Sequence, residues 1–112
     1  MQIRRLLALA VIGFSLTAAA DFRTVTEVHE LWLSNVRLPA TTSGTLSFSE
    51  CAECQVVTLR ASAATRYAVN GKTVSLVDFR KAIAGVSNRN DQMVDVFHHL
   101  DTNTVTAVEI KL

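Results

Sequence analysis

The sequence predicts a mainly β domain with one short helix, folded as a small antiparallel barrel or half-barrel of the OB-like kind from about six strands. Three observations predict it. Several short stretches alternate between apolar and polar residues, which is the period of a half-buried strand. Asn70-Gly71 stands between two such stretches and is a strong short-range signal of a hairpin. Only the segment from Ser75 to Gly85 repeats its apolar residues at helical spacing.

The first twenty residues have the pattern of a secretory signal peptide. A basic start precedes an apolar run, residues 6–16, and small residues follow, with Ala18 and Ala20 at the cleavage-site positions. The apolar run is shorter than the roughly 20 residues that a membrane-spanning helix needs. We therefore expect residues 1–20 to be removed and Asp21 to begin a periplasmic or secreted protein. The alternative is an uncleaved membrane anchor.

Cleavage would shorten the 112-residue chain by 20 and leave 92 residues, 21–112, which suffice for a single small domain. It would also remove Arg4 and Arg5, so that nine basic residues face ten acidic ones and the net charge becomes −1. A nearly neutral chain has no field to concentrate phosphates, so we expect no nucleic-acid partner. No second apolar run approaches membrane-spanning length, so we expect no membrane association after cleavage.

The first elements of the domain follow from local composition. Residues 22–30 are mixed and polar, and we expect them to be loosely ordered or to form a short helical turn. Residues 31–38 are rich in apolar side chains and end at Pro39, which predicts a strand. Residues 40–44 have the composition of a loop.

Two predicted strands flank the cysteines. Residues 45–49 and 57–61 both alternate between apolar and polar side chains. The segment Cys51-Ala52-Glu53-Cys54 therefore lies between two strands, at or near a hairpin turn.

A hairpin and the helix come next. Asn70-Gly71 separates residues 66–69 from residues 72–74, and both turn residues must take positive φ. Ser75 is a good N-cap for the helix that follows, and Gly85 is a good terminator.

The remaining residues predict a second hairpin. Residues 87–91 form a polar loop, and strands over residues 93–99 and 105–112 surround a turn at residues 101–104.

A series of short motifs occupies about half of the chain after the signal segment: Thr65-Arg66, Tyr67 to Lys72, Ser75 to Phe79, Val94 to Phe97 and Thr104 to Leu112. This series, within Leu59 to Leu112, resembles small secreted bacterial β domains of the type catalogued as domain of unknown function 5666. Such domains pass from the helix to the next strand through a short Gly-Asp, whereas this chain has Gly85 to Asp91 there. The resemblance implies a small OB-like or related barrel. It implies no known reaction, cofactor or substrate.

Cys51 and Cys54 form the one motif that could carry chemistry. An even number of cysteines in an exported chain favours a disulfide, and this spacing can close a tight turn, so we expect a structural disulfide. The first alternative is a thiol–disulfide oxidoreductase, which needs an activated cysteine at a helix N-terminus. The residues from Gln55 to Leu59 instead predict a strand, and Glu50 and Glu53 would repel a thiolate.

The second alternative is a metal site in which the two cysteines supply two of four ligands. His98 and His99 are adjacent on a predicted strand and point to opposite faces, so they cannot easily bind one ion together. One of them, with His29 or Glu53, would have to complete the site. We therefore assign no metal ligand and no cofactor.

The sequence contains no nucleophile elbow and no glycine-rich phosphate loop, so we assign no catalytic residue. Trp32 has the opposite strand parity to Leu31 and Leu33, and if exposed it would mark a binding surface. The sequence thus favours an exported, non-catalytic binding or interaction domain whose partner is an unidentified protein or small ligand. The alternative is a periplasmic thiol-redox or metal-binding protein that uses Cys51 and Cys54.

Overall fold

A computed structural model describes residues 25–112, which form a mainly β fold with one α-helix. The predicted signal segment, residues 1–20, lies outside the described residues. The elements are, in order, β1 (Thr26–Trp32), the 3₁₀ turn η3 (Leu33–Asn35), β2 (Val36–Arg37), β3 (Thr45–Phe48), β4 (Val57–Arg60), β5 (Arg66–Val69), β6 (Lys72–Val74), α2 (Leu76–Ala84), the 3₁₀ turn η4 (Arg89–Asp91), β7 (Met93–His99) and β8 (Thr104–Ile110). Within this part of the chain, no helix has the length and apolarity needed to cross a membrane.

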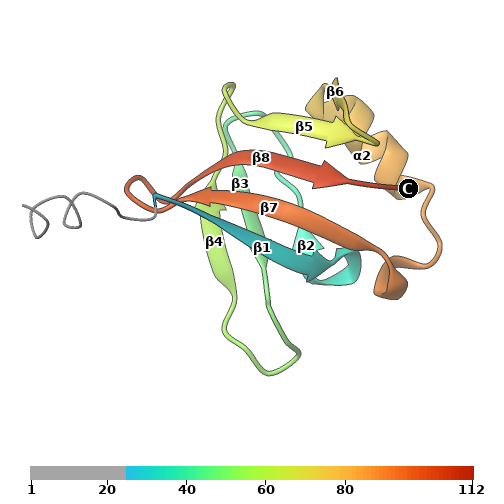
Figure 1. The fold of residues 1–112 in the computed structure, drawn as a ribbon, viewed down its shortest axis with the longest axis horizontal. Coiled ribbons are helices and arrows are strands. Elements are labelled where there is room, and N and C mark those ends of the chain that lie inside the picture. The colour runs from blue at the N-terminus through green and yellow to red at the C-terminus, as the bar shows by residue number, and fades with distance from the viewer. Residues whose placement is uncertain (1–24) are drawn as a thin grey trace, which may run out of the picture.

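The predicted β class is confirmed, and the sheet itself is larger and more mixed than expected. It has eight strands rather than six, in the order β1-β7-β8-β4-β3-β2, and β5 pairs with both β8 and β6. The predicted all-antiparallel pairing is wrong at β8, which runs parallel to β4 and to β5. In Figure 1, β7 and β8 cross the middle of the molecule, with β3 and β4 behind them. The sheet does not close into a barrel.

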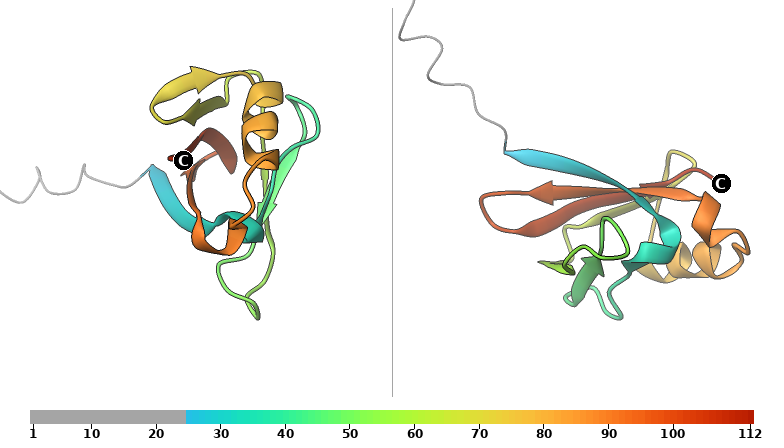
Figure 2. Two further views of the ribbon diagram at one scale, coloured as in Figure 1. Left: turned by 90° about the vertical axis from the view of Figure 1, so that its right-hand side faces the viewer. Right: turned by 90° about the horizontal axis from the view of Figure 1, so that it is seen from below.

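The parallel pairs arise because β4 and β5 share one edge of β8. Arg60 is in register with Thr104, and Arg66 is in register with Ala107 further along the same strand. Between them the chain makes a turn, in which the N–H of Thr65 donates to the carbonyl oxygen of Ser62. The buried Thr65 holds this turn against β8 by donating its hydroxyl to the carbonyl oxygen of Val105 at 2.7 Å. The sheet therefore divides at β8 into two arms, β2–β4 and β5–β6, and α2 lies between them (Figure 2).

The hairpins and the helix form where the sequence predicts them. Asn70 and Gly71 have φ of 53° and 82°, the left-handed conformation that the turn requires. Asn103 takes φ of 56° in the β7–β8 turn. The hydroxyl of Ser75 accepts the backbone N–H of Asp78 at 3.1 Å and caps α2.

Two predictions near the start of the domain are wrong. Residues 26–30, expected to be loose or helical, belong to β1, because β1 lies along β7 over its whole length and each pairs its backbone groups with the other. The strand predicted over residues 31–38 is broken by η3, where the N–H of Leu33 donates to the carbonyl oxygen of Gln92 at 2.8 Å. This contact turns the chain from β1 into the short strand β2.

The core lies between the two arms and under α2. Its buried members come from every strand except β6, from the 3₁₀ turn η3 and from α2: Leu31, Leu33, Val36, Leu46, Phe48, Leu59, Tyr67, Leu76, Phe79, Ile83, Val94, Val96, Val105, Val108 and Ile110. Along β7, Val94 and Val96 point into this core and His98 follows them on the same face. The core-facing side of β7 therefore changes from apolar side chains at Val94 and Val96 to a polar one at His98, toward the β7–β8 turn.

Candidate functional site

Cys51 and Cys54 form a disulfide at the tip of the β3–β4 loop, as the sequence predicts. Their Cα atoms are 5.0 Å apart, and the N–H of Cys54 donates to the carbonyl oxygen of Cys51 across the turn. Both cysteines are exposed, and the loop projects from the body of the molecule (Figure 1). Residues 25–112 contain no free cysteine, so neither sulfur is a thiolate ligand, and no helix begins at the pair.

Trp32 lies on the outer face of β1, with 45% of its surface exposed, while Leu31 and Leu33 are buried. The predicted parity is therefore correct. Trp32 is in register with Met93 of β7, which is also exposed, so the two side chains form a small apolar pair at one end of the sheet. Its role as a binding surface stays a prediction.

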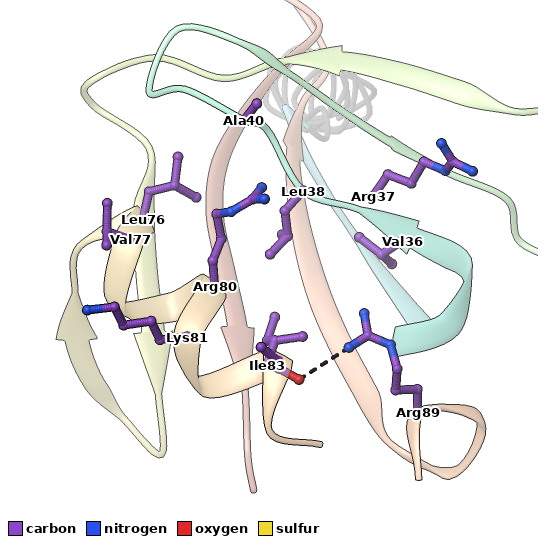
Figure 3. Close-up of a pocket in the computed structure, with 11 residues that line it drawn as sticks. Val36, Arg37, Leu38, Ala40, Leu76, Val77, Arg80, Lys81, Ile83 and Arg89 are labelled. Atoms are coloured by element: carbon purple, nitrogen blue, oxygen red, sulfur yellow. Dashed lines mark hydrogen bonds between the residues drawn. The ribbon is translucent and has the colours of Figure 1, made fainter. Parts of the chain in front are cut away.

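A groove of about 700 Å³ lies between α2 and the chain that leaves β2 (Figure 3). Apolar side chains form most of its lining, including the buried Leu76 and Ile83 of α2. The full lining is Val36, Arg37, Leu38, Ala40, Leu76, Val77, Arg80, Lys81, Ile83, Ala84 and Arg89. Its size lies within the roughly 300–1,000 Å³ of small-molecule sites.

Four cations and no carboxylate line the groove. Arg80 donates to the carbonyl oxygen of Pro39 at 2.8 Å. Arg89 donates to the carbonyl oxygen of Ile83 at 3.2 Å, as Figure 3 shows. These carbonyls hold the guanidinium groups in place without neutralising their charge. Within residues 25–112, neither Arg37 nor Lys81 has an ion-pair partner, so the groove carries uncompensated positive charge.

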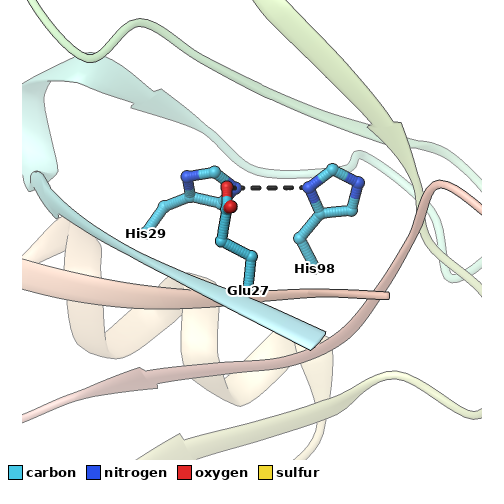
Figure 4. A group of neighbouring side chains, drawn as sticks. All are labelled: Glu27, His29 and His98. Carbon is cyan, nitrogen blue, oxygen red and sulfur yellow. Dashed lines mark hydrogen bonds and ion pairs between the residues drawn. The ribbon is translucent and has the colours of Figure 1, made fainter. Parts of the chain in front are cut away.

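The histidines are placed in two different environments. His98 and His99 point to opposite sides of β7, as expected, and Nδ1 of His99 lies 3.1 Å from the hydroxyl of Thr102. His98 instead meets His29 of β1, with Nε2 of His29 3.2 Å from Nδ1 of His98 (Figure 4). Glu27 lies beside this pair.

Two ionisable side chains have a shifted pKa. Burial raises the pKa of Tyr67 above its usual value of 10.0. The pKa of Asp95, on the outer face of β7, is raised above 3.8, first by partial burial and then by the negative charges of Glu30 and Glu109. Both carboxylates stand in register with Asp95, Glu30 on β1 and Glu109 on β8.

Fold and site together define a small mixed β-sheet domain with a disulfide in its β3–β4 loop and a groove lined by apolar and cationic side chains. No family model matches the chain, and no curated protein and no solved structure matches it either. The resemblance to domain of unknown function 5666 stays a prediction.

Sequence reasoning missed the groove. It considered His29 with His98 or His99 only as partners of the two cysteines, and not as a histidine pair apart from the disulfide. The groove cations come from β2, α2 and η4, and none of their segments is unusually basic. His29 and His98 are 69 residues apart, and only the pairing of β1 with β7 brings them together. A correct prediction of β1 and its partner would have been needed to find the histidine pair.

Proposed function

We propose that this protein is an exported, non-catalytic binding domain that holds a small amphipathic anion, such as a long-chain carboxylate, in the groove between α2 and β2. One observation carries the proposal: four cationic side chains and no carboxylate surround an apolar groove of ligand size. An apolar chain would cover exposed side chains such as Val77, and its acidic head would face Arg37 or Lys81.

The charge of the groove is local, which favours recognition of a ligand over general attraction of anions. The whole chain carries a formal charge of only +1, so the positive charge around the groove is not a property of the chain as a whole. The cations are also anchored in different elements, so a bound head group would bridge β2 and α2. No reaction is assigned to the protein.

Isothermal titration of the purified protein with dodecanoate tests the groove, with dodecyltrimethylammonium as the cationic counterpart of similar chain length. We expect dodecanoate to bind and the cation not to bind. The double variant Arg37→Gln/Lys81→Gln should weaken dodecanoate binding by about tenfold or more, since a hydrogen bond to a charged group contributes about 1.5–3 kcal/mol. Neither side chain has a hydrogen-bond partner in residues 25–112, so the fold should not depend on them.

Arg60→Gln provides the matched control, because Arg60 is an exposed arginine of β4 that does not line the groove. It should leave the affinity unchanged. Equal binding of the cationic detergent, no binding of dodecanoate, or an equal loss in the control variant would overturn the proposal.

Export is tested separately, by the intact mass of the protein recovered from the medium or periplasm of the cells that make it. A chain that begins at Asp21 and lacks two hydrogen masses for the Cys51–Cys54 bond is expected. A chain that keeps residues 1–20 and stays in the cytoplasm would overturn this part of the proposal and leave the groove test untouched.

A further inference from the structure

We propose that Glu27, His29 and His98 bind a divalent transition-metal ion of the zinc class. The sheet register brings them together: Glu27 stands directly opposite His98, and His29 lies two residues further along the same face of β1. These positions continue the face that buries Leu31 and Val96. Two neighbouring inward positions of β1 and one of β7 thus carry metal-ligand residues where the pattern of the core would place apolar ones.

Two of the three distances between the donor atoms fit a tetrahedral ion. Nε2 of His29 lies 3.2 Å from Nδ1 of His98 and 3.4 Å from Oε1 of Glu27, and one donor atom from each of the three residues lies within 4.8 Å of the others. Zinc–ligand bonds of about 2.0–2.2 Å at tetrahedral angles place neighbouring donors about 3.4 Å apart. The His29 pairs already have this spacing, and Glu27, whose side chain is 55% exposed, can move the remaining distance.

The outer hydrogen bonds of the two imidazoles leave their facing nitrogens available as metal ligands. Nδ1 of His29 lies 3.1 Å from a carboxylate oxygen of Glu50, which only accepts, so this nitrogen is the donor of that hydrogen bond. Nε2 of His98 lies 2.8 Å from Oδ1 of Asn103, so there too the outer nitrogen is the donor. When each ring is neutral and donates through its outer nitrogen, the two facing nitrogens both carry lone pairs and can both ligate one ion. Without an ion, the 3.2 Å hydrogen bond between them needs a proton on one of the two.

The surrounding structure holds this arrangement in place. The side chain of His29 is only 10% exposed, and its ring centroid lies 4.8 Å from that of Phe48. Asn103 sits in the β7–β8 turn, and its carbonyl oxygen accepts the N–H of Arg60 from β4. An oxygen partner on the outer nitrogen of each histidine is the usual way in which proteins orient imidazole ligands toward a metal.

Two imidazoles and one carboxylate provide three ligands and leave one position for a solvent molecule or an exchangeable ligand. This donor set suits zinc and its neighbours in the first transition row and not Mg²⁺ or Ca²⁺, which prefer oxygen ligands. The site shares no residue with the groove, so the two proposals can fail independently.

Calorimetric titration of untagged, EDTA-dialysed protein with ZnCl₂ tests the site, with MgCl₂ as the comparison ion. We expect one Zn²⁺ per chain and no response to Mg²⁺. His29→Gln and His98→Gln should each weaken zinc binding by at least about 100-fold. Loss of only the hydrogen-bond partner of a metal ligand weakens binding by roughly 10–100-fold, and loss of the ligand itself should cost at least as much. His99→Gln is the matched control, since His99 is the next residue on the opposite face, and it should bind zinc like the parent protein.

Folding of each variant is checked by its melting transition in EDTA, followed through the fluorescence of Trp32. Imidazole ¹⁵N spectra of the unsubstituted protein give a second readout that needs no variant: zinc should shift Nε2 of His29 and Nδ1 of His98 and leave His99 unchanged. Failure of Zn²⁺ to bind, resonance shifts confined to His99, or an equal loss of affinity in all three variants would overturn the proposal.

Discussion

At the scale of single residues, Tyr67 and Asp95 carry the clearest electrostatic consequences of the fold. Among the described residues, the hydroxyl of Tyr67 is the one buried side-chain polar atom that has no hydrogen-bond partner. Its ring packs against Phe79 of α2, with centroids 5.4 Å apart. The ring therefore contributes to the core, while the hydroxyl gives up its bonds to water and gains none in return.

Replacing Tyr67 with Phe should raise the free energy of unfolding by about 1 kcal/mol, because a buried hydroxyl without a partner is removed and the ring is kept. The raised pKa adds a pH dependence. Above pH 10 the phenol ionises in the unfolded chain and stays protonated in the folded one, so the stability of the parent protein falls as pH rises. Urea unfolding from pH 8 to 11 should show this fall in the parent protein relative to the Phe variant. A Phe variant that is less stable at pH 8 would contradict the prediction.

Asp95 stands between Glu30 and Glu109 on the outer face, and directly opposed like charges destabilise a sheet by about 0.2–1 kcal/mol. Asp95→Asn should therefore stabilise the protein at pH 7 by up to about 1 kcal/mol. Because the folded-state pKa is raised, the folded protein takes up the proton at a higher pH than the unfolded chain. The advantage of the variant should therefore disappear as pH falls below 3.8. Thermal unfolding from pH 3 to 7 measures it.

Glu53→Gln is the control for Asp95→Asn, since it removes one negative charge from the exposed β3–β4 loop. It should change the melting temperature little. Equal stabilisation by both variants would assign the effect to net charge rather than to the carboxylates around Asp95.

At the scale of elements, the parts that the sequence predicts are those that depend on neighbouring residues. The Asn70-Gly71 turn, the Ser75 cap and the alternation in β3 are decided within a few residues, and all three form as expected. β1 was missed because its inward positions include Glu27 and His29, so the apolar period of a strand is absent. The two residues that interrupt the apolar period of this strand are two of the three ligands of the proposed metal site.

The disulfide acts on one element, the β3–β4 loop. It closes a very short loop, so the chain-entropy model gives it no more than about 2 kcal/mol of stabilisation. The double variant Cys51→Ser/Cys54→Ser should keep the β-sheet circular dichroism and lose stability by about that amount in urea unfolding. Loss of the sheet would contradict a local role.

The redox alternative makes a different prediction for the same pair. A structural disulfide resists the glutathione pool, with a potential below about −300 mV, whereas a redox-active one is more oxidising. Equilibration of the protein in glutathione buffers, read by alkylation and mass, should leave the bond intact. Reduction at ordinary glutathione ratios would move the function toward Cys51 and Cys54.

At the scale of the whole molecule, β8 joins the two arms of the sheet. Its partners β4 and β5 lie far from it in the sequence, and local patterns do not specify which of them pairs with it or in which direction. This is why the mixed sheet, and with it the groove between α2 and β2, could not be predicted. The buried Thr65 is the side chain that fixes the junction, through the carbonyl oxygen of Val105 and the N–H of Ser62.

Thr65→Val should destabilise the protein by about 1–3 kcal/mol, because it keeps the shape of the side chain and leaves buried polar groups without their partner. Thr65→Ser keeps the hydroxyl and should recover most of the loss. Chemical denaturation of both variants measures the difference. If the Ser variant is destabilised as much as the Val variant, the methyl group and not the hydrogen bonds holds the junction.

The central place of β8 also determines when the chain can fold. Among the described strands β8 is the latest in sequence, yet β4, β5 and β7 all pair with it, and β1 has only β7 as its partner. A ribosome or an export channel that delivers the chain from its amino end thus releases β1 to β6 before either central strand is present. Those segments can form only the hairpin of β5 with β6 and the small sheet of β2 to β4. The complete eight-stranded sheet therefore cannot form until β8, which ends at Ile110, has emerged.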